Sequence, residues 1–236
     1  MMYGKVTSPS EQPAFWALPL SRIAEELQTD IEHGISEEEA QTRLAAFGPN
    51  VIEQSQQASW LVILLSQFKS PLILILLIAS GVTFAIDHHR DAFFILAAVV
   101  VNTILGFYQE FKAERALAEL KTYLKQRSRV IRGGSEHEID AAQVVPGDCI
   151  RLAQGDRVPA DARLVFVNDF QIDEAILTGE SLPASKSTDS SLSDAALGDQ
   201  RSMVFAGTLV TQGIGTAIVC RTGFSTELWK IAALVA

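Results

Sequence analysis

Two long uncharged runs stand out in the pattern of apolar and polar positions along the chain. The first covers residues 60–86, with Lys69 as its one charged residue, and the second covers residues 92–109. A helix that spans a bilayer needs about 20 predominantly apolar residues, so the pattern predicts membrane helices near 60–86 and 92–110. Only residues 87–91 separate them. The two helices are therefore predicted to form a hairpin with both outer ends on one side of the membrane.

Two residues qualify this picture of the first run. Pro71 lies inside it and predicts a kink, and Lys69 is expected to extend its ammonium group toward the interface. The alternative is that both runs are core helices of a soluble protein. A chain of 236 residues is too short to cover two such helices on every side, and this favours the membrane.

The second run is followed closely by five basic residues, namely Lys112, Arg115, Lys121, Lys125 and Arg127. The connecting segment offers only Arg90. Positively charged flanks stay on the cytosolic side of a membrane, so the N-terminus and everything after residue 110 are predicted to be cytosolic. The chain is then an integral, multi-pass membrane protein. Helical spacing continues to about Leu124, and the second helix is predicted to leave the membrane as a stalk.

The segment before the apolar runs has the pattern of a small helical module. Residues 1–13 are polar and contain prolines, which predicts disorder. Ser21 is interpreted as the cap of a first short helix. A Ser-x-x-Glu capping box that starts at Ser36 predicts a second helix, and Gly48 followed by proline predicts its end. Residues 1–59 are therefore predicted to be a cytosolic helical module.

From residue 128 onward the apolar period shortens toward two. Strands are predicted at 129–132, 138–140, 149–152, 163–167 and 215–219. Gly and Pro punctuate them, and Gly133-Gly134 predicts a tight turn. The pattern favours a compact β-rich domain of sandwich or barrel type over residues 128–236. Within it, residues 185–200 are predicted to be a mobile surface loop, and residues 227–236 an apolar helix.

Composition and charge exclude some kinds of partner and site. The net charge of −9 argues against nucleic acid, because phosphate contacts need clusters of Lys and Arg. Cys149 and Cys220 lie in apolar, strand-like contexts and are predicted to be buried thiols rather than zinc ligands. His88 and His89 fit a solvated loop better than a metal site. The first 25 residues lack the apolar core of a signal peptide, so the N-terminus is expected to stay in the cytosol.

The tetrapeptide Thr178-Gly179-Glu180-Ser181 is the strongest candidate for chemistry. Glycine permits backbone angles that other residues avoid, so a tight exposed loop is expected here. The carboxylate of Glu180 would then point outward and handle a proton or a water molecule. Taken alone, most tetrapeptides of this composition are ordinary surface turns.

Further motifs occur in a fixed order around this tetrapeptide. They are Phe47-Gly48-Pro49-Asn50, Gln67-Phe68-Lys69-Ser70-Pro71-Leu72, Gly106-Phe107-Tyr108-Gln109-Glu110, Pro146-Gly147-Asp148, Gly155-Asp156-Arg157-Val158-Pro159-Ala160-Asp161, Phe205-Ala206-Gly207-Thr208 and Thr222-Gly223. With them, nearly the whole chain resembles the N-terminal part of P-type cation-transporting ATPases. The resemblance implies an N-terminal cation-ATPase module at 1–59, a transmembrane hairpin with stalk at 60–127, and an actuator domain at 128–236. It also implies that this α+β membrane protein carries a distorted jelly-roll or sandwich in its β-rich domain.

The resemblance also implies roles for single residues. In such pumps ATP phosphorylates an aspartate on a separate domain, and water later removes the phosphoryl group. Glu180 would position and polarise that water, Gly179 would let the backbone approach, and Thr178 and Ser181 would hold the loop or contact the phosphoryl region. Supporting rather than reactive roles are expected for Asp173, Glu174, Asp148, Gly155, Asp156, Pro159 and Asp161.

Several family motifs are missing from the sequence. It contains neither the Asp-Lys-Thr-Gly phosphorylation motif nor the Lys-Gly-Ala and Thr-Gly-Asp-Gly motifs of the nucleotide-binding region. ATP and Mg²⁺ are therefore implied for a complete pump and not for this chain, which is expected to be inactive alone. Its expected partners are membrane lipid and the missing phosphorylation, nucleotide-binding and later transmembrane parts. A truncated gene, a split gene or an expressed fragment would each explain such a chain.

The transported ion is not fixed by these residues. The N-terminal module and Gln109-Glu110 favour the type II pumps, calcium-transporting members first, with magnesium and proton pumps as alternatives. A heavy-metal pump is disfavoured because no Cys-x-x-Cys module precedes the helices. Trp229, where the family usually has Gly, and Ala184, where Val is common, depart from its pattern. The competing hypothesis is a non-enzymatic two-helix anchor that presents a β-domain and regulates a full pump; an adjoining reading frame with Asp-Lys-Thr-Gly would argue against it.

Overall fold

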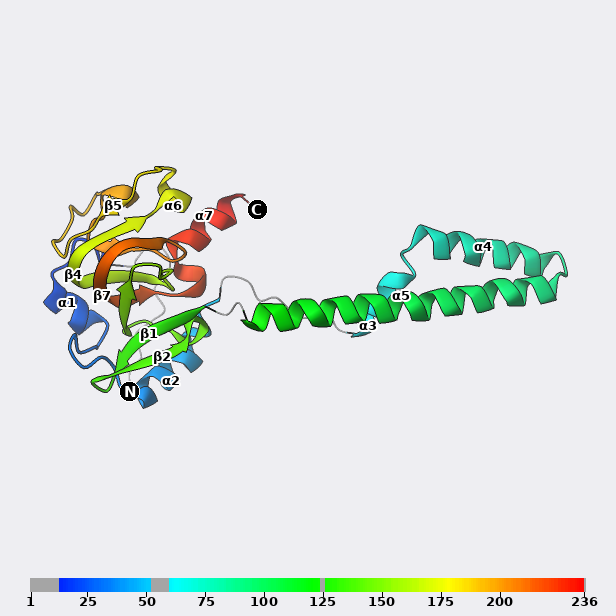
Figure 1. Cartoon of the computed structure of the whole chain (residues 1–236), viewed down its shortest axis with the longest axis horizontal. Helices are drawn as coiled ribbons and strands as arrows, with labels where there is room; N and C mark the ends of the chain where they lie inside the picture. The colour runs from blue at the N-terminus through cyan, green and yellow to red at the C-terminus, as the bar shows by residue number, and fades with distance from the viewer. Residues whose placement is uncertain (1–12, 52–59, 124–125, 236) are drawn as a thin grey trace. The chain divides into compact units, whose positions relative to one another are not determined.

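The computed structural model describes residues 13–51, 60–123 and 126–235 (Figure 1). The chain divides into two compact units, one made of the residues up to 53 together with those from 126 onward, the other of residues 54–125. The N-terminal segment thus packs with the β-rich region. The disorder expected at the start of the chain falls on residues 1–12, outside the described residues, as does the predicted end of the stalk at Leu124. The domain boundaries near 59 and 127 stay a prediction.

The helical unit contains α3 (Trp60–Gln67), α4 (Pro71–Ala85) and α5 (His89–Tyr123). The predicted single helix over 60–86 is therefore wrong in one respect, because it stops at Gln67 and restarts at Pro71. Ser70 between them has extended backbone, with φ −64° and ψ 126°. A residue that precedes proline is driven out of the helical region, and Pro71 itself is well suited to the first position of the new helix.

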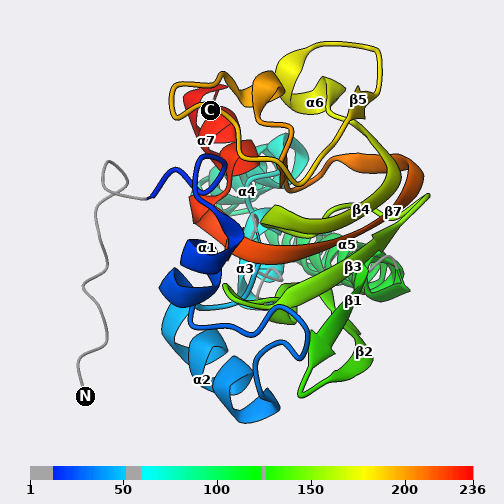
Figure 2. The same ribbon diagram turned by 90° about the vertical axis from the view of Figure 1, so that its left-hand side faces the viewer.

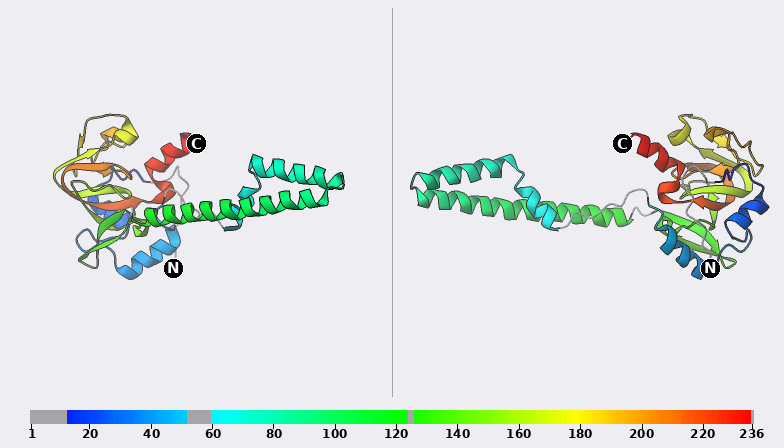
Figure 3. Two further views of the ribbon diagram at one scale, coloured as in Figure 1. Left: turned by 45° about the vertical axis from the view of Figure 1, so that its right-hand side comes forward. Right: turned by 180° about the vertical axis from the view of Figure 1, so that it is seen from behind.

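The second helix agrees with its prediction over most of its length, and α5 continues through the basic stretch to Tyr123. Its neighbour α4 lies side by side with it (Figures 1 and 3), and the Ser80 hydroxyl donates a 3.2 Å hydrogen bond to the Ala92 carbonyl. Among the described residues, one helix segment, His89–Ala116, is both long and apolar enough to cross a membrane. The 15 residues of α4 rise about 22 Å at 1.5 Å each, less than the roughly 30 Å hydrocarbon core.

The β-rich unit is built on an antiparallel sheet (Figure 2). Within the described residues its strands follow the order β2-β1-β3-β7-β4-β5, and β6 pairs with β4. Their bounds are β1 Arg127–Arg132, β2 Ser135–Asp140, β3 Cys149–Ala153, β4 Asp161–Asp173, β5 Ala184–Ser185, β6 Met203–Val204 and β7 Leu209–Arg221. Every strand predicted from the period of two is present, and Gly133-Gly134 makes the β1–β2 turn. The sandwich or jelly-roll type stays a prediction.

Helices complete this unit. They are α1 Leu20–Glu26, α2 Glu37–Phe47, α6 Ala175–Thr178 and α7 Glu227–Val235, with 3-10 turns at Ala141–Gln143, Leu197–Asp199 and Gly223–Ser225. The N-cap half of the predicted capping box is confirmed, because the Ser36 hydroxyl accepts a 3.1 Å hydrogen bond from the Glu39 amide, while the Glu39 carboxylate accepts a 2.7 Å bond from Arg43. Ser21 as a cap is wrong. Pro19 holds the cap position of α1, and its fixed φ starts the helix before Ser21.

The sheet buries apolar side chains on both faces. Neighbours along a strand point to opposite faces, and Ile150 and Cys149 accordingly belong to two different core clusters. The second cluster contains Phe15 and Ile23 from the N-terminal segment, so this segment covers one face. Both cysteines are buried, as predicted. Burial raises the pKa of Cys149 to about 11 and that of Cys220 to about 12.

Polar contacts fasten the N-terminal segment more specifically. The Asn50 side-chain amide donates to the carbonyls of Ala141 and Pro159, at 3.0 and 2.9 Å, and its oxygen accepts a 2.8 Å bond from the Gly223 amide. Arg43, nearly buried, donates to the Pro146 carbonyl at 2.9 Å. The segment is therefore integrated into the β-rich unit rather than appended to it.

Replacing Asn50 by alanine removes three hydrogen bonds and leaves their partly buried partners unsatisfied. We expect Asn50→Ala to lower the free energy of unfolding of the β-rich unit by about 1–3 kcal/mol. Urea unfolding followed by tryptophan fluorescence measures this. Asn168→Ala, an exposed position on β4, is the control and should stay within about 0.5 kcal/mol. Equal effects of the two changes would contradict the assignment.

Candidate functional site

The predicted loop follows a single helical turn, α6, at the end of the sheet opposite β2 (Figures 1 and 2). Gly179 ends α6 in the left-handed region, with φ 77° and ψ 0°. A Cβ there would meet no atom within 4 Å. Glycine is therefore favoured by the backbone conformation and not by lack of space. This turn places Glu180 and Ser181 in solvent, where both are exposed.

Thr178 ties this loop to the residues before it. Its hydroxyl accepts a 3.2 Å hydrogen bond from the Glu180 amide and donates one of 3.2 Å to the Glu174 carbonyl. The Asp173 carboxylate accepts a 2.9 Å bond from the Ala175 amide at the start of α6. The described contacts thus give Thr178 and Asp173 holding roles. They show Ser181 as exposed and assign it no partner.

Below the loop lies an ion pair that the sequence reasoning missed. The Lys186 ammonium stands 2.5 Å from a carboxylate oxygen of Glu174, and the two side chains are 0% and 4% exposed. Burial raises the pKa of Glu174 and lowers the pKa of Lys186, and the opposite charge of the partner counteracts each shift. A lysine five residues beyond the motif, preceded by Pro183-Ala184-Ser185, was the available signal, but sequence spacing did not reveal its partner.

Apolar packing fixes the underside of α6. Leu177 packs against the core cluster that contains Met203 and Phe205, whereas its neighbour Ile176 is exposed. A helix of one turn is not stable by itself in water. The position of α6 therefore depends on this anchor and on the contacts of Glu174.

The other residues expected to support the fold lie away from the loop. Asp148 is fully buried and accepts two hydrogen bonds from Arg132, at 2.9 and 2.8 Å. Asp161 accepts from the amides of Ala206 and Glu227, at 2.9 and 2.8 Å. Asp156 accepts a 2.8 Å bond from the Ala153 amide. These are scaffold contacts, as predicted.

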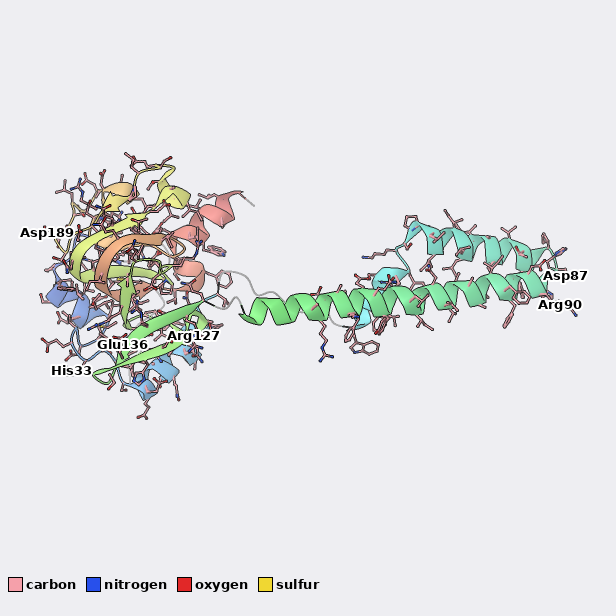
Figure 4. The ribbon with its side chains drawn as sticks, viewed as in Figure 1. His33, Asp87, Arg90, Arg127, Glu136 and Asp189 are labelled. Carbon is pink, nitrogen blue, oxygen red and sulfur yellow. The ribbon has the colours of Figure 1, made fainter. Side chains whose placement is uncertain are left out.

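The side chains that could hold a metal ion are dispersed over the described residues. Within the described parts of the chain, no three His, Cys, Asp or Glu side chains gather where a metal ion could be held. His88 and His89 pair with Asp91 and Asp87, at 3.2 and 2.9 Å, on exposed side chains at the α4–α5 turn where Figure 4 labels Asp87 and Arg90.

Comparison with known proteins agrees with this geometry. A family model described as the P-type ATPase actuator domain matches residues 122–236, and a second, described as the N-terminus of cation transporters and ATPases, matches residues 15–83. The chain belongs to the P-type cation-transporting ATPases and corresponds to their N-terminal module and actuator domain.

Curated relatives share this arrangement over most of the chain. The probable cation-transporting ATPase F of Mycobacterium tuberculosis is 42% identical over 97% of this chain and 25% of its own length. A calcium-transporting ATPase of Bacillus subtilis is 38% identical over 89% of the chain and 24% of its own. A sodium/potassium exporting P-type ATPase of Schizosaccharomyces pombe is 34% identical over 97% and 22%. The chain thus spans about a quarter of the length of these relatives.

The buried Asp161 gives the β-rich unit a pH dependence. Burial raises the pKa of this carboxyl from 3.8 to about 6 despite its two amide donors. The folded state then binds the proton more tightly than the unfolded state between these values, so stability decreases as the pH rises through this window. Above about pH 6 both states are ionised and the dependence from this group ends.

We expect the stability difference between the unmodified chain and Asp161→Asn to change with pH, because asparagine does not ionise. Between about pH 4 and pH 6 the unmodified chain should lose about 2 kcal/mol relative to the variant. Urea unfolding at a series of pH values provides the measurement. A constant difference across this range would show that the carboxyl has an ordinary pKa.

Proposed function

We propose that this chain is the N-terminal part of a pump that uses ATP to move a cation across a membrane. In this proposal Glu180 promotes hydrolysis of an aspartyl phosphate carried by another part of the pump. The support is membership of the P-type family together with the match of two of its N-terminal domains. The complete activity requires segments that lie outside the sequence of this chain.

The observation that carries the proposal is the placement of Glu180. Its side chain is exposed just beyond the left-handed Gly179, while the backbone behind it is held by Thr178. A general base must come within about 2.6–3.2 Å of the proton it accepts. An exposed carboxylate on a fastened turn can reach a water molecule at the surface of a second domain. Glu180 would accept a hydrogen bond from that water and orient its lone pair toward the phosphorus atom.

The helical unit supports a membrane role. We propose that α5 crosses the bilayer and that α3 and α4 together form the other arm of a hairpin, with both ends of the unit cytosolic. In this arm α4 would lie in the hydrocarbon core and α3 in the interfacial region, and Lys69 lies at the break between the two helices. The basic residues after position 110 favour this orientation. The transported cation is proposed to be calcium first, since relatives are named for calcium as well as for sodium and potassium.

Glu180→Gln keeps the size of the side chain and removes its basicity. In a pump assembled from this chain and the missing C-terminal part, we expect phosphoenzyme to form at a nearly unchanged rate. Its decay should slow by roughly 100-fold, as is typical when a general base is lost. Chase experiments with radioactive ATP measure both steps. Asp194→Asn, another exposed carboxylate of the same unit, is the control and should behave as the unmodified pump; an unchanged decay in Glu180→Gln would remove the proposed role.

The topology is tested independently by cysteine labelling. In a background where Cys149 and Cys220 are replaced by serine, a cysteine introduced by His88→Cys should react with an impermeant maleimide added outside intact cells. A cysteine introduced by Ser187→Cys should react only after the membrane is opened, because the β-rich unit is proposed to be cytosolic. The reverse pattern of labelling would show that the orientation is wrong.

A further inference from the structure

We propose that the buried pair Glu174–Lys186 is a positioning device that fixes the Glu180 loop for its reaction. This inference rests on the proposed function and adds two residues to it. Neither side chain reaches solvent, so neither acts on a substrate directly. Their effect would pass through the backbone that carries Glu180.

The pair closes the base of the loop. The chain leaves the sheet at the end of β4 and returns through β5, where Ile172 pairs with Ala184. The Lys186 amide then donates a 3.0 Å hydrogen bond to the Phe170 carbonyl. Glu174 lies two residues beyond Ile172, on the loop side of this short ladder, whereas Lys186 lies at the opposite end, one residue beyond Ser185. The ion pair therefore reaches back along the ladder and ties Glu174, at the start of the loop, to the strand through which the chain returns.

Each member of the pair depends on the other. Within the described residues, the Lys186 ammonium and both Glu174 carboxylate oxygens have no conventional hydrogen-bond partner apart from their mutual contact. The Lys186 ammonium also makes a cation–π contact with the ring of Phe205, whose centroid is 5.7 Å from the lysine nitrogen. A buried charge without a partner is strongly unfavourable. Any loop conformation that separates Glu174 from Lys186 would leave both buried charges unpaired and would therefore be unfavourable.

A continuous line of contacts connects the pair to Glu180. The Glu174 carbonyl accepts hydrogen bonds from the Thr178 amide at 3.0 Å and from the Thr178 hydroxyl at 3.2 Å. The same hydroxyl accepts a 3.2 Å hydrogen bond from the Glu180 amide. Displacement of Glu174 therefore displaces Thr178 and, through it, the backbone of Glu180. Since α6 is a single turn, it has few intrahelical bonds of its own to resist such a shift.

Energetics favour a positioning role over a purely stabilising one. Replacing a buried ion pair by neutral groups of similar volume is often neutral or even stabilising, whereas removing one partner is costly. Among the described residues Glu174 and Lys186 have no other charged partner, so their pair would act mainly by disfavouring loop conformations that separate them. For a reacting group this matters, because a misplacement of about 1 Å can cost roughly 100-fold in rate.

The test removes both charges together. A single substitution would leave one buried charge unpaired and would destabilise the β-rich unit. The pair variant is Glu174→Gln with Lys186→Met, studied with and without Glu180→Gln in the pump assembled with its C-terminal part. The control is Glu136→Gln with Arg151→Met, which removes an exposed ion pair that includes Glu136 of the β1–β2 hairpin (Figure 4). Phosphoenzyme formation and decay are measured for each.

We expect the pair variant to form phosphoenzyme normally and to slow its decay by at least roughly tenfold. In the Glu180→Gln background the pair variant should add no further slowing, because a positioning effect acts through Glu180 and couples fully with its loss. The control pair should change neither rate. Further slowing in that background would overturn the proposal in favour of general damage.

Two failures are distinguishable. If Glu180→Gln slows decay and the pair variant does not, the positioning role is wrong and the proposed function stands. If Glu180→Gln itself leaves decay unchanged, the proposed function fails and this inference fails with it.

Amide hydrogen exchange on this 236-residue chain in lipid nanodiscs gives a second measurement without turnover. In the pair variant, exchange should accelerate at residues 175–183 while the amides of β3 and β7 keep their protection. Unchanged exchange at the loop, or faster exchange across the whole sheet, would each overturn the proposal.

Discussion

The antiparallel ladder between β4 and β7 is the interaction on which the rest of the β-rich unit depends. Both strands are 13 residues long, and their pairing runs from Asp161 opposite Arg221 to Asp173 opposite Leu209. Four register shifts bend it, since each irregularity increases the local twist. The end of β4 delivers the chain to the Glu180 loop, and the end of β7 delivers it to α7. One ladder thus sets where the Glu180 loop and α7 leave the sheet.

Buried charge is used on this scaffold at defined junctions. Arg132 and Asp148 join β1 to the turn before β3, and Glu174 and Lys186 join the two limbs of the Glu180 loop. Asp161 joins two distant segments by accepting hydrogen bonds from their backbone amides. Buried ionic groups add little net stability when paired, but they strongly disfavour other pairings. They therefore specify how the loops meet the sheet more than they hold the sheet together.

Sequence reasoning succeeded where the signal is local and failed where it depends on contacts distant in sequence. The period of two located the strands, and the capping box located α2, because neighbouring residues determine both. The capping role of Ser21 was wrong because Pro19 already starts α1. The break at Phe68–Ser70 followed from the restriction that Pro71 imposes on Ser70, which was interpreted only as a kink. The motif singled out Glu180, whose role stays a prediction, whereas Lys186 could not be paired with Glu174 without the fold.

In the proposed function, an exposed carboxylate acts on a phosphoryl group carried by another part of the pump. A general base built into a pocket is positioned by the walls of that pocket, but Glu180 is exposed on the surface of the β-rich unit. The position of the proposed base would therefore be set by the backbone that carries it. The contacts concerned are the Gly179 turn, the Thr178 hydroxyl and the buried Glu174–Lys186 pair. Such a group remains idle until a second domain brings water and phosphoryl group within hydrogen-bond reach. The proposed role would thus tie the reaction to domain docking, because the backbone of Glu180 is held by Thr178 while its side chain stays exposed.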